Sequence, residues 1–429
     1  MVDAELCDRV ISCGSRGSHV LPRLIRLDAA VTGRHAAWMN LLLLRNAQVY
    51  APEPLGLQHL LLGGGCILWM GAQLADLPAA LSVETIDLQG RRLIPGLIDA
   101  HVHATGGGGE AGFRTRVPPQ GISRFTRAGI TTVVGLLGTD DVARGPRDLL
   151  ATVYALREEG LSALAFTGGY HVPPQTLTGS VRGDLVFIEA LIGIGEVAIS
   201  DHRSSQPTLD ELMRLAADAH VAGLMTGKAG VLHLHLGDGL RGLDLVRQAL
   251  EKSELPPRVF HPTHVNRRKG LFDEALALTA GGCTIDLTAF PVEEGEDAWS
   301  AADALLRYLD SGAHAERITV SSDAGGCLPT FDANGHVCKM GVGESGALLD
   351  TLNEVVARGV PLERALPSFT QNPARLLRLA AKGYIGVGAD ADLVALDSAG
   401  AAHDVIARGV VHVRDGRIKH HGMFEDAST

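Results

Sequence analysis

The chain has 429 residues, a formal net charge of −11 at neutral pH and 46% hydrophobic residues. This length suits a large domain with a smaller partner, and the composition is that of a globular protein rather than a fibrous or disordered one. The acidic balance argues against a nucleic-acid surface, because such a surface needs clustered basic side chains to neutralise phosphates. We therefore expect neither nucleic acid nor a membrane among its partners.

The first 38 residues differ from those that follow. They contain no apolar run long enough for a signal peptide, and their acidic side chains do not fit a transit peptide. A regular strand pattern starts at Met39, so we interpret residues 1–38 as either a disordered tail or a mis-assigned start. The six cysteines lack both metal-site spacing and a dense disulfide pattern, which favours a reducing, cytoplasmic environment.

Short apolar segments separated by turn-forming residues occupy both ends of the remaining chain. Near the start they predict strands of a small antiparallel sheet at Leu41–Leu44, His59–Leu62, Cys66–Met70 and Val83–Leu88. Similar segments return at Tyr384–Asp397 and Ala402–Lys419, and the ends of a domain commonly lie close together. We therefore predict one small β-sandwich domain formed by residues 39–90 and 381–429.

The middle of the chain, residues 91–380, alternates apolar strands with helical stretches such as Pro146–Glu159 and Leu209–Ala222, a pattern typical of parallel sheets. The predicted strands are Leu93–Asp99, Thr131–Leu136, Ala163–Thr167, Glu196–Asp201, Val231–Leu236, Val259–Pro262, Cys283–Leu287 and Ile318–Ser322. Eight such units predict an α/β fold with a (β/α)8 TIM barrel, whose functional residues follow the carboxyl ends of the strands.

Side chains suited to metal binding follow these predicted strand ends. His101 and His103, two apart on the first strand, point to the same side and could share a metal ion. Later strands lead to Tyr170, Glu196, His235, His264 and Asp323. Two divalent ions need about this set of ligands, and they would acidify a water molecule held between them. Asp323 would bind one ion and carry a proton from the attacking water to a leaving amine.

These residues resemble a known superfamily. Pro95-Gly-Leu-Ile-Asp-Ala-His101-Val-His103, with histidines and an aspartate at the later strands, is similar to the amidohydrolase superfamily. The likeness extends to the isoaspartyl dipeptidases over nearly all of residues 39–429. The segments that carry it are His101-Val-His-Ala-Thr-Gly-Gly-Gly-Gly-Glu110, Gly135-Leu-Leu-Gly-Thr139, Gly168-Gly-Tyr170-His-Val-Pro173, Thr178-Gly-Ser-Val181, Ala198-Ile-Ser-Asp-His-Arg203, His235-Leu-Gly-Asp238 and Pro262-Thr-His264-Val-Asn-Arg267.

This resemblance implies an enzyme that hydrolyses β-aspartyl (isoaspartyl) dipeptides, with two divalent metal ions, which we expect to be zinc. It also implies a homo-oligomer and a small dipeptide as the partner. The metal ligands would be His101, His103, Glu196, His235, His264 and Asp323.

The resemblance further assigns the substrate contacts. Glu110 would receive the free α-amino group, Gly108 and Thr139 would contact the substrate backbone, and Arg203 and Arg267 would bind its carboxylates. Tyr170 would polarise the scissile carbonyl and act in catalysis beside Asp323. The chemistry agrees, because arginine binds carboxylates through paired N–H groups and a phenol can donate to a developing oxyanion.

Two positions depart from the family pattern. The family usually bridges its metals with a carboxylated lysine on the fourth strand, where this chain has Glu196. Its carboxylate carries the same charge but reaches roughly 4 Å less far, and a glycine bulge in Ile192-Gly-Ile-Gly-Glu196 could bring it inward. A site for a single metal is the alternative. Cys327 replaces a serine that lies near the substrate carboxylate in the family, so the specificity could differ.

Three functions therefore remain under consideration. The leading hypothesis is a metallo-dipeptidase for β-aspartyl dipeptides. The second is a related amidohydrolase that acts on a cyclic amide or an N-acyl amino acid, which the change at Cys327 permits. The third is a non-catalytic barrel scaffold, against which the complete set of metal-binding side chains argues.

Overall fold

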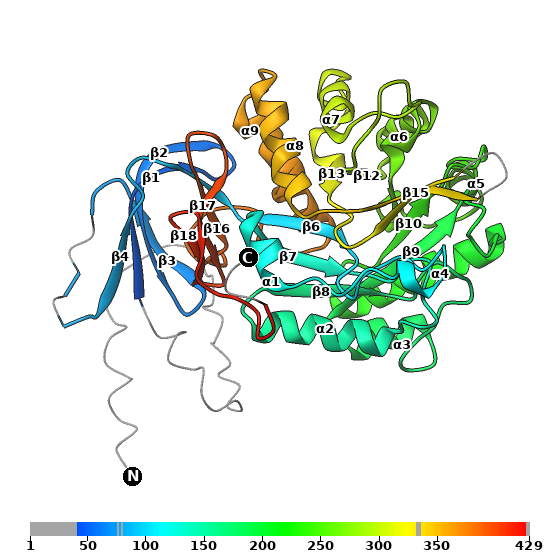
Figure 1. Cartoon of the computed structure of the whole chain (residues 1–429), viewed down its shortest axis with the longest axis horizontal. Helices are drawn as coiled ribbons and strands as arrows, with labels where there is room; N and C mark the ends of the chain where they lie inside the picture. Colours follow the sequence, from blue (N-terminus) through cyan, green and yellow to red (C-terminus); the bar gives the residue numbers. More distant parts are fainter. Residues whose placement is uncertain (1–40, 75–76, 79, 332–335, 426–429) are drawn as a thin grey trace, which may run out of the picture. The chain divides into compact units, whose positions relative to one another are not determined.

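The computed structural model describes residues 41–74, 77–78, 80–331 and 336–425 (Figure 1). The segment 1–38 and the alternative start at Met39, both considered above, lie outside the described residues. Within these ranges no helix has the length and apolar character needed to cross a membrane.

Segments from both ends of the described chain share one nine-stranded sheet, in the order β19-β18-β17-β16-β5-β1-β2-β3, with β4 beside β1. Its strands are β1 Leu41–Tyr50, β2 Pro54–Gly63, β3 Cys66–Gly71, β4 Val83–Asp87, β5 Arg92–Pro95, β16 Leu393–Leu396, β17 Ala402–Ala407, β18 Val410–Arg414 and β19 Arg417–Ile418. Strand β5 joins the two halves, antiparallel to β16 and parallel to β1. Leu44, Leu60 and Leu393 belong to a buried core of this sheet.

This arrangement corrects two details of the predicted sandwich. The strands form one hydrogen-bonded sheet of mixed direction rather than a purely antiparallel structure, because β4 and β5 both run parallel to β1. In the segment predicted as a strand at Tyr384–Asp397, only Leu393–Leu396 is one.

The eight strands between residues 97 and 321 follow one another in the order that a barrel requires. They are β6 Leu97–Val102, β7 Ile130–Gly135, β8 Ser162–Thr167, β9 Leu191–Ile199, β10 Val231–Leu236, β11 Phe260–Thr263, β12 Ile285–Thr288 and β13 Ile318–Ser321. Strands β6 to β11 form a parallel sheet, and β12 pairs with β13 separately.

The predicted barrel is therefore not closed by a continuous ladder of hydrogen bonds in the described chain. Strand β12 lies next to β11 without a ladder, and β13 likewise lies next to β6 without one. An isolated bridge pairs Val102 with Ala324, just after β13. The His103 N–H donates to the Ala324 carbonyl there, at 2.9 Å. The structure is therefore a curled parallel sheet of six strands, and the separate pair β12–β13 lies between its two edge strands, β11 and β6.

Helices follow the strands and pack a large apolar core against them (Figure 1). They are α1 Ile122–Arg127, α2 Pro146–Glu158, α3 Val181–Phe187, α4 Leu209–Thr226, α5 Asp244–Lys252, α6 Lys269–Gly281, α7 Ala301–Asp310, α8 Gly346–Ala357, α9 Leu362–Ala365 and α10 Gln371–Leu376. Local sequence explains their ends: a capping box of Thr208 and Glu211 starts α4, and Gly227 ends it in the left-handed conformation. A hairpin of β14 Cys327–Phe331 and β15 Val337–Val342 follows β13.

Two barrel strands start four or more residues away from the predicted position, and four others differ by one or two residues. The first starts at Leu97 rather than Leu93, because Arg92–Pro95 pairs with β16 and β1 in the other sheet. The fourth starts at Leu191, so Glu196 lies inside β9 and not at its end.

Glu196 lies at an irregularity of β9. Ile194 pairs with Leu232 and Val197 with Leu234, so three steps along β9 match two along β10. The predicted glycine bulge is confirmed by this register shift. Glycine is required beside it, since a Cβ on Gly195 would lie 2.8 Å from the His233 Cβ.

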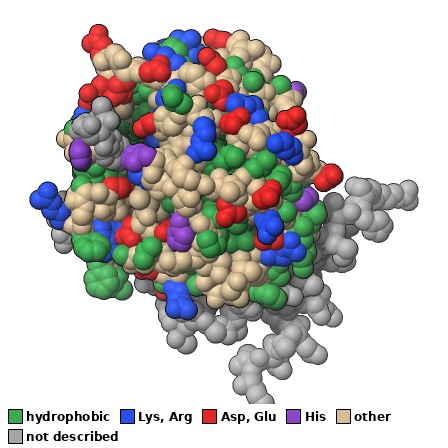
Figure 2. Space-filling model, turned by 90° about the vertical axis from the view of Figure 1, so that its right-hand side faces the viewer, with side chains coloured by type: hydrophobic (Ala, Val, Ile, Leu, Met, Phe, Trp, Pro, Cys, Tyr) green, Lys and Arg blue, Asp and Glu red, His purple; other side chains and the backbone are tan. Residues whose placement is uncertain are grey.

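Charged side chains of both signs are interspersed with hydrophobic and polar ones on the face shown in Figure 2. The face carries no extended area of a single charge.

The packing at the bulge leads to a stability prediction. Gly195→Ala should lower the free energy of unfolding by about 1–3 kcal/mol, because the added methyl group overlaps β10. Gly270→Ala in α6, where a Cβ meets nothing within 4 Å, is the matched control and should leave stability unchanged or slightly raised. Denaturant unfolding of both variants measures this, and equal stabilities would contradict the tight packing at Gly195.

Candidate functional site

Four histidines and two carboxylates converge at the carboxyl ends of the barrel strands. His101 and His103 come from β6, Glu196 from β9, His235 from β10, His264 follows β11 and Asp323 follows β13. All six predicted metal ligands are buried, and none is more than 6% exposed. The structure therefore brings the whole predicted ligand set together.

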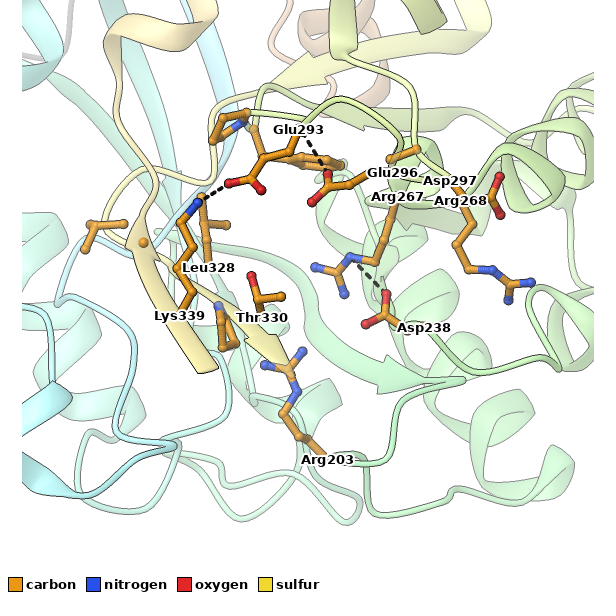
Figure 3. A pocket seen from close by; sticks show the side chains of 16 residues that line it. Arg203, Asp238, Arg267, Arg268, Glu293, Glu296, Asp297, Leu328, Thr330 and Lys339 are labelled. Carbon is orange, nitrogen blue, oxygen red and sulfur yellow. Dashed lines mark hydrogen bonds and ion pairs between the residues drawn. The ribbon is translucent and has the colours of Figure 1, made fainter. Parts of the chain in front are cut away.

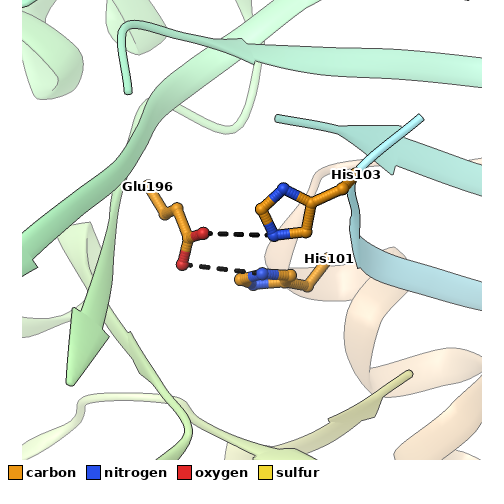
Figure 4. A group of neighbouring side chains, drawn as sticks. All are labelled: His101, His103 and Glu196. Carbon is orange, nitrogen blue, oxygen red and sulfur yellow. Dashed lines mark ion pairs between the residues drawn. The ribbon is translucent and has the colours of Figure 1, made fainter. Parts of the chain in front are cut away.

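Glu196 lies at the centre of this cluster, facing His101 and His103 across the barrel (Figure 4). Its Oε1 is 3.3 Å from the His103 Nε2, and its Oε2 is 3.5 Å from the His101 Nε2. The same Oε2 lies 3.1 Å from the His235 Nδ1 and 3.4 Å from the His264 Nε2. Glu196 thus belongs to both the pair on β6 and the pair on β10 and β11, as a bridging ligand would.

Asp323 completes the cluster on the side of β6. Its Oδ1 lies 3.1 Å from the His103 Nε2 and 3.4 Å from the His101 Nε2. Ligand atoms in a tetrahedron around zinc, at about 2.0–2.1 Å from the ion, are about 3.4 Å apart. The observed separations therefore suit donors that share a small cation.

Two features of the described residues test whether a metal ion fits here. The His101 Nε2 and the Asp323 Oδ1 are buried and have no hydrogen-bond partner in the described part of the chain. Two buried carboxylates also need compensating positive charge, because burying an unpaired charge is costly. The donor set of imidazoles and carboxylates suits zinc and similar ions, so the residues fit such a group.

The acid–base properties follow from this crowding. Burial opposes ionisation of Asp323, but its contacts with His101 and His103 outweigh that effect and hold its pKa well below the ordinary value. The pKa of Glu196 is also well below its usual range, for the same reason. Burial lowers the pKa of His264 to about 3, which favours the neutral imidazole that binds metals.

No lysine takes part in the cluster. Lys228 is the first lysine of the chain, and its Nζ donates to the carbonyls of Leu185, Ile188 and Leu191, at 2.6, 2.6 and 3.0 Å. It is thereby held at the amino end of β9, away from the site. Glu196 is consequently the residue of β9 that can supply a bridging negative charge.

The backbone is strained where the strands end. Ser200, His264 and Asp323 all have positive φ values, of 52°, 61° and 55°, which non-glycine residues seldom adopt. Such conformations concentrate at functional sites, where the surrounding structure enforces them.

One cavity unites the metal cluster with the predicted substrate contacts. It is lined by His103, Gly108, Glu110, Gly138, Thr139, Tyr170, Glu196, Arg203, His235, His264, Arg267, Asp323 and Cys327. All the predicted site residues except His101 are in this set. Gly138 is the one lining residue that sequence reasoning did not single out.

Glu110 lines this cavity, and one of its two carboxylate oxygens has no hydrogen-bond partner among the described residues. Its Oε1 accepts a hydrogen bond from the Thr139 Oγ1 at 3.0 Å and lies 3.5 Å from the Arg203 Nη1. Its buried Oε2 has no hydrogen-bond partner among the described residues. An oxygen of this kind is suited to accept a cationic group such as an amine.

Asp201, whose role the sequence did not reveal, positions Arg203. The Arg203 Nε and Nη2 donate to the two carboxylate oxygens of Asp201 at 3.1 and 2.8 Å, which leaves Nη1 facing Glu110. The Asp201 Oδ2 is also 3.0 Å from the His235 Nε2. Contacts with His235 and Arg203 outweigh burial and hold the pKa of Asp201 well below its usual range. The only sequence signal was its place in Ser200-Asp-His-Arg203.

Tyr170 reaches the cluster from the loop after β8. Its Oη lies 2.8 Å from the His235 Nδ1. Burial, reinforced by the charge of Glu196, raises the pKa of Tyr170 well above its ordinary value, so the phenol keeps its proton. Tyr170 is therefore available as a hydrogen-bond donor in the cavity.

A larger cavity of about 530 Å³ adjoins the first, and Arg203 and Arg267 line both (Figure 3). The hairpin β14–β15 contributes Leu328, Thr330 and Lys339 to it, while Phe290 and Pro291 add an apolar wall. Arg267 also donates to the Leu236 carbonyl at 3.1 Å, and Asp238 lies 3.8 Å from its Nε.

Comparisons with known proteins agree with this geometry. A sequence profile described as the amidohydrolase family matches residues 92–420. The chain belongs to the amidohydrolase family. Among solved structures, it is similar to a β-aspartyl dipeptidase of Fervidobacterium islandicum AW-1 in complex with β-Asp-Leu. The TM-score is 0.82 and the identity 41%, covering 88% of this chain and 98% of that one.

Curated relatives of this amidohydrolase carry other names. An imidazolonepropionase of Ruegeria pomeroyi is 26% identical over 377 residues, covering 81% of this chain and 90% of the relative. A deacetylase of Agrobacterium fabrum is 24% identical over 365 residues, covering 79% and 78%. The names of these relatives therefore differ, while the family is the same.

The cavity predicts the reactivity of its cysteine. Burial and the nearby charge of Glu110 raise the pKa of Cys327 to about 12, whereas Cys338 is exposed. Iodoacetamide at pH 8 should therefore modify Cys338 well before Cys327, because the thiolate is the reactive form. Peptide mass spectrometry over time measures both rates.

A charge variant serves as the control for that experiment. Glu110→Gln should speed the alkylation of Cys327 several-fold, since it removes the negative charge that disfavours the thiolate. An unchanged rate would show that Glu110 and Cys327 do not interact.

Proposed function

We propose that this amidohydrolase hydrolyses β-aspartyl dipeptides with the help of two divalent metal ions, zinc being the expected metal. The observation that carries the proposal is the charge pattern of the cavity, where a carboxylate with a free oxygen and two arginines surround a buried metal-ligand cluster. A β-aspartyl dipeptide has one free amino group and two free carboxylates, so its charges are complementary to these groups. The similarity to a β-aspartyl dipeptidase at 41% identity supports the same assignment.

In this proposal the substrate lies across both cavities. Glu110 Oε2 receives the α-amino group, while Gly108 and Thr139 lie beside the aspartyl backbone. The local backbone requires glycine at position 108, because its φ is +78° and a Cβ there would lie 2.5 Å from the Thr115 carbonyl oxygen. Arg203 and Arg267 bind the carboxylates, and the leaving residue occupies the larger cavity that both arginines line.

The chain's own residues would assist the reaction as follows. His101, His103, Glu196, His235, His264 and Asp323 would hold the metal ions. Divalent ions, when bound, supply Lewis-acid chemistry that makes water more acidic. Asp323 contacts the histidines through Oδ1, which leaves Oδ2 to take a proton from water and pass it to the leaving amine. Tyr170 donates its hydroxyl hydrogen to the carbonyl oxygen of the scissile amide.

A second candidate is hydrolysis of a cyclic amide or an N-acyl amino acid. The imidazolonepropionases at about a quarter identity favour it, since their name refers to a ring-containing substrate. The free oxygen of Glu110 favours the dipeptide, because a ring amide without an amino group would leave that oxygen unpaired. The scaffold alternative is weaker, because a scaffold does not require six buried metal-binding side chains.

The decisive test compares two isomeric substrates. β-Asp-Leu should be cleaved and α-Asp-Leu should not, as followed by release of leucine. Arg267→Ala should lower kcat/KM for β-Asp-Leu by tens-fold or more, because a charge-assisted contact to a carboxylate is lost. Arg247→Ala, at an exposed arginine of α5 paired with Glu274, is the control and should leave kcat/KM unchanged. Equal cleavage of both isomers would refute the β-aspartyl assignment.

A separate prediction concerns Glu196 as the bridging ligand. Metal-free protein given zinc in carbon-dioxide-depleted buffer should take up close to two ions per chain, with or without bicarbonate, because no lysine carbamate has to form. Glu196→Gln should bind less metal, since a neutral amide cannot offset two dications in a buried site. Glu189→Gln, at an exposed carboxylate, is the matched control. Bicarbonate-dependent uptake, or full metal content in Glu196→Gln, would exclude the bridge.

A further inference from the structure

A chain of buried polar side chains runs from the metal cluster into the interior of the barrel. The His101 Nδ1 lies 2.8 Å from the His233 Nε2, and the His233 Nδ1 lies 2.9 Å from the His261 Nδ1. His233 is on β10, two residues before His235, and His261 is on β11. Three imidazoles are thus linked nitrogen to nitrogen.

The chain continues to a carboxylate. The His261 Nε2 is 3.2 Å from the Thr319 Oγ1, and that hydroxyl donates to the Asp286 Oδ1 at 2.5 Å. Thr263 and Ser321 also donate to Asp286, through hydroxyls 2.7 and 2.5 Å from its Oδ2. Every member from His101 to Asp286 is fully buried, with an exposed fraction of 0%.

Simple packing does not account for this arrangement. The interior of such barrels is usually filled by branched apolar side chains, and buried polar groups are costly unless each is hydrogen-bonded. Phe166, stacked on His233 at 5.0 Å between ring centroids, shows that an apolar ring fits beside this position. The side chains of this path are hydrogen-bonded to one another. If their role were only structural, the hydrogen bonds could run in either direction along the path.

The two ends of the chain nevertheless impose one direction. At one end, the His101 Nε2 faces Glu196 and Asp323 and has no hydrogen-bond partner in the described chain, so a metal there requires its lone pair. His101 must then carry its hydrogen on Nδ1 and donate it to the His233 Nε2. At the other end, the hydroxyls of Thr263, Thr319 and Ser321 all donate to Asp286, so its carboxyl oxygens act as acceptors.

The intermediate hydrogens follow from these two ends. His233, which accepts at Nε2, carries its hydrogen on Nδ1 and donates to the His261 Nδ1. His261 therefore carries its hydrogen on Nε2 and donates to the Thr319 Oγ1, whose own hydrogen goes to Asp286. All four donors point away from the metal cluster, and none conflicts with another.

We propose that His233, His261 and Thr319 are positioning residues that hold His101 in the tautomer whose Nε2 lone pair faces the metal. Asp286 anchors the far end of the chain. Outer hydrogen bonds of this kind fix the orientation of metal-binding histidines and increase their basicity. This inference rests on the proposed metal binding but not on the identity of the substrate.

The hydrogen positions can be measured directly. Neutron diffraction from crystals of the zinc-loaded, full-length protein should place hydrogens on the Nδ1 of His101 and His233 and on the Nε2 of His261. A hydrogen on the His261 Nδ1 would reverse the chain and overturn the proposal.

Metal affinity provides the second test, by chelator competition. His233→Phe keeps a ring beside Phe166 but removes both hydrogen bonds, and it should weaken zinc binding by about 10–100-fold. Thr319→Val keeps the side-chain shape but removes the acceptor for His261, and it should weaken zinc binding several-fold. Thr319→Ser keeps the hydroxyl and should restore the affinity of the natural protein. This pair keeps the proposal testable if His233→Phe does not fold.

The outcomes separate the possible failures. Unfolding of each metal-free variant is measured in parallel, because a purely structural chain would lower stability without changing zinc affinity in the folded protein. Variants that fold and bind zinc as tightly as the natural protein would overturn the positioning role alone. A natural protein that takes up no zinc would refute the metal centre itself, and with it this inference.

Discussion

The site depends on two carboxylates, Glu196 and Asp323, that are buried together among four histidines. Their oxygens lie 3.1–3.5 Å from the imidazole nitrogens, and 5% or less of either residue is exposed. Charges so far from water require compensation at short range, which imidazole donors and a bound cation can provide. The strained backbone at His264 and Asp323 is tolerated because the strands that precede them, β11 and β13, are each hydrogen-bonded to a neighbouring strand.

The sheet adjusts locally to satisfy this requirement. A glutamate is shorter than the carboxylated lysine that the family resemblance led us to expect, and β9 bulges beside β10 where Glu196 lies. The glycines before it leave room for that bulge against β10, since a Cβ on Gly193 would lie 2.7 Å from the Val231 carbonyl oxygen. The bulge of β9 thus compensates for the shorter side chain of Glu196.

Electrostatics also organise the substrate cavities. Asp201 occupies one edge of the Arg203 guanidinium, so that arginine presents only its remaining Nη1 toward Glu110. Glu110 in turn keeps one oxygen without a partner. We propose that this unequal use of the charged groups favours ligands whose own charges match its arrangement.

The sequence by itself determined the ligand types and their order along the chain. Strand periodicity and the positions of His101, His103, His235, His264 and Asp323 after apolar segments sufficed to predict a metal site on a parallel sheet, because strand ends converge at one edge. The glycines before Glu196 likewise signalled a bulge. The spacing of residues along the sequence could not indicate that Asp201 contacts Arg203. It also could not indicate that His233 and His261 contact each other inside the barrel.

Only the tertiary structure decided these remaining features. The segment Arg92–Pro95 reads as part of the first barrel strand, yet it pairs with β16, some 300 residues later in the chain, and so belongs to the other sheet. The barrel ladder is interrupted beside β12 and β13, which no local pattern reveals. The hydrogen-bonded path from His101 to Asp286 joins five strands. Long-range pairing sets such contacts, since the periodicity of a strand fixes which side a residue faces but not which side chain it meets there.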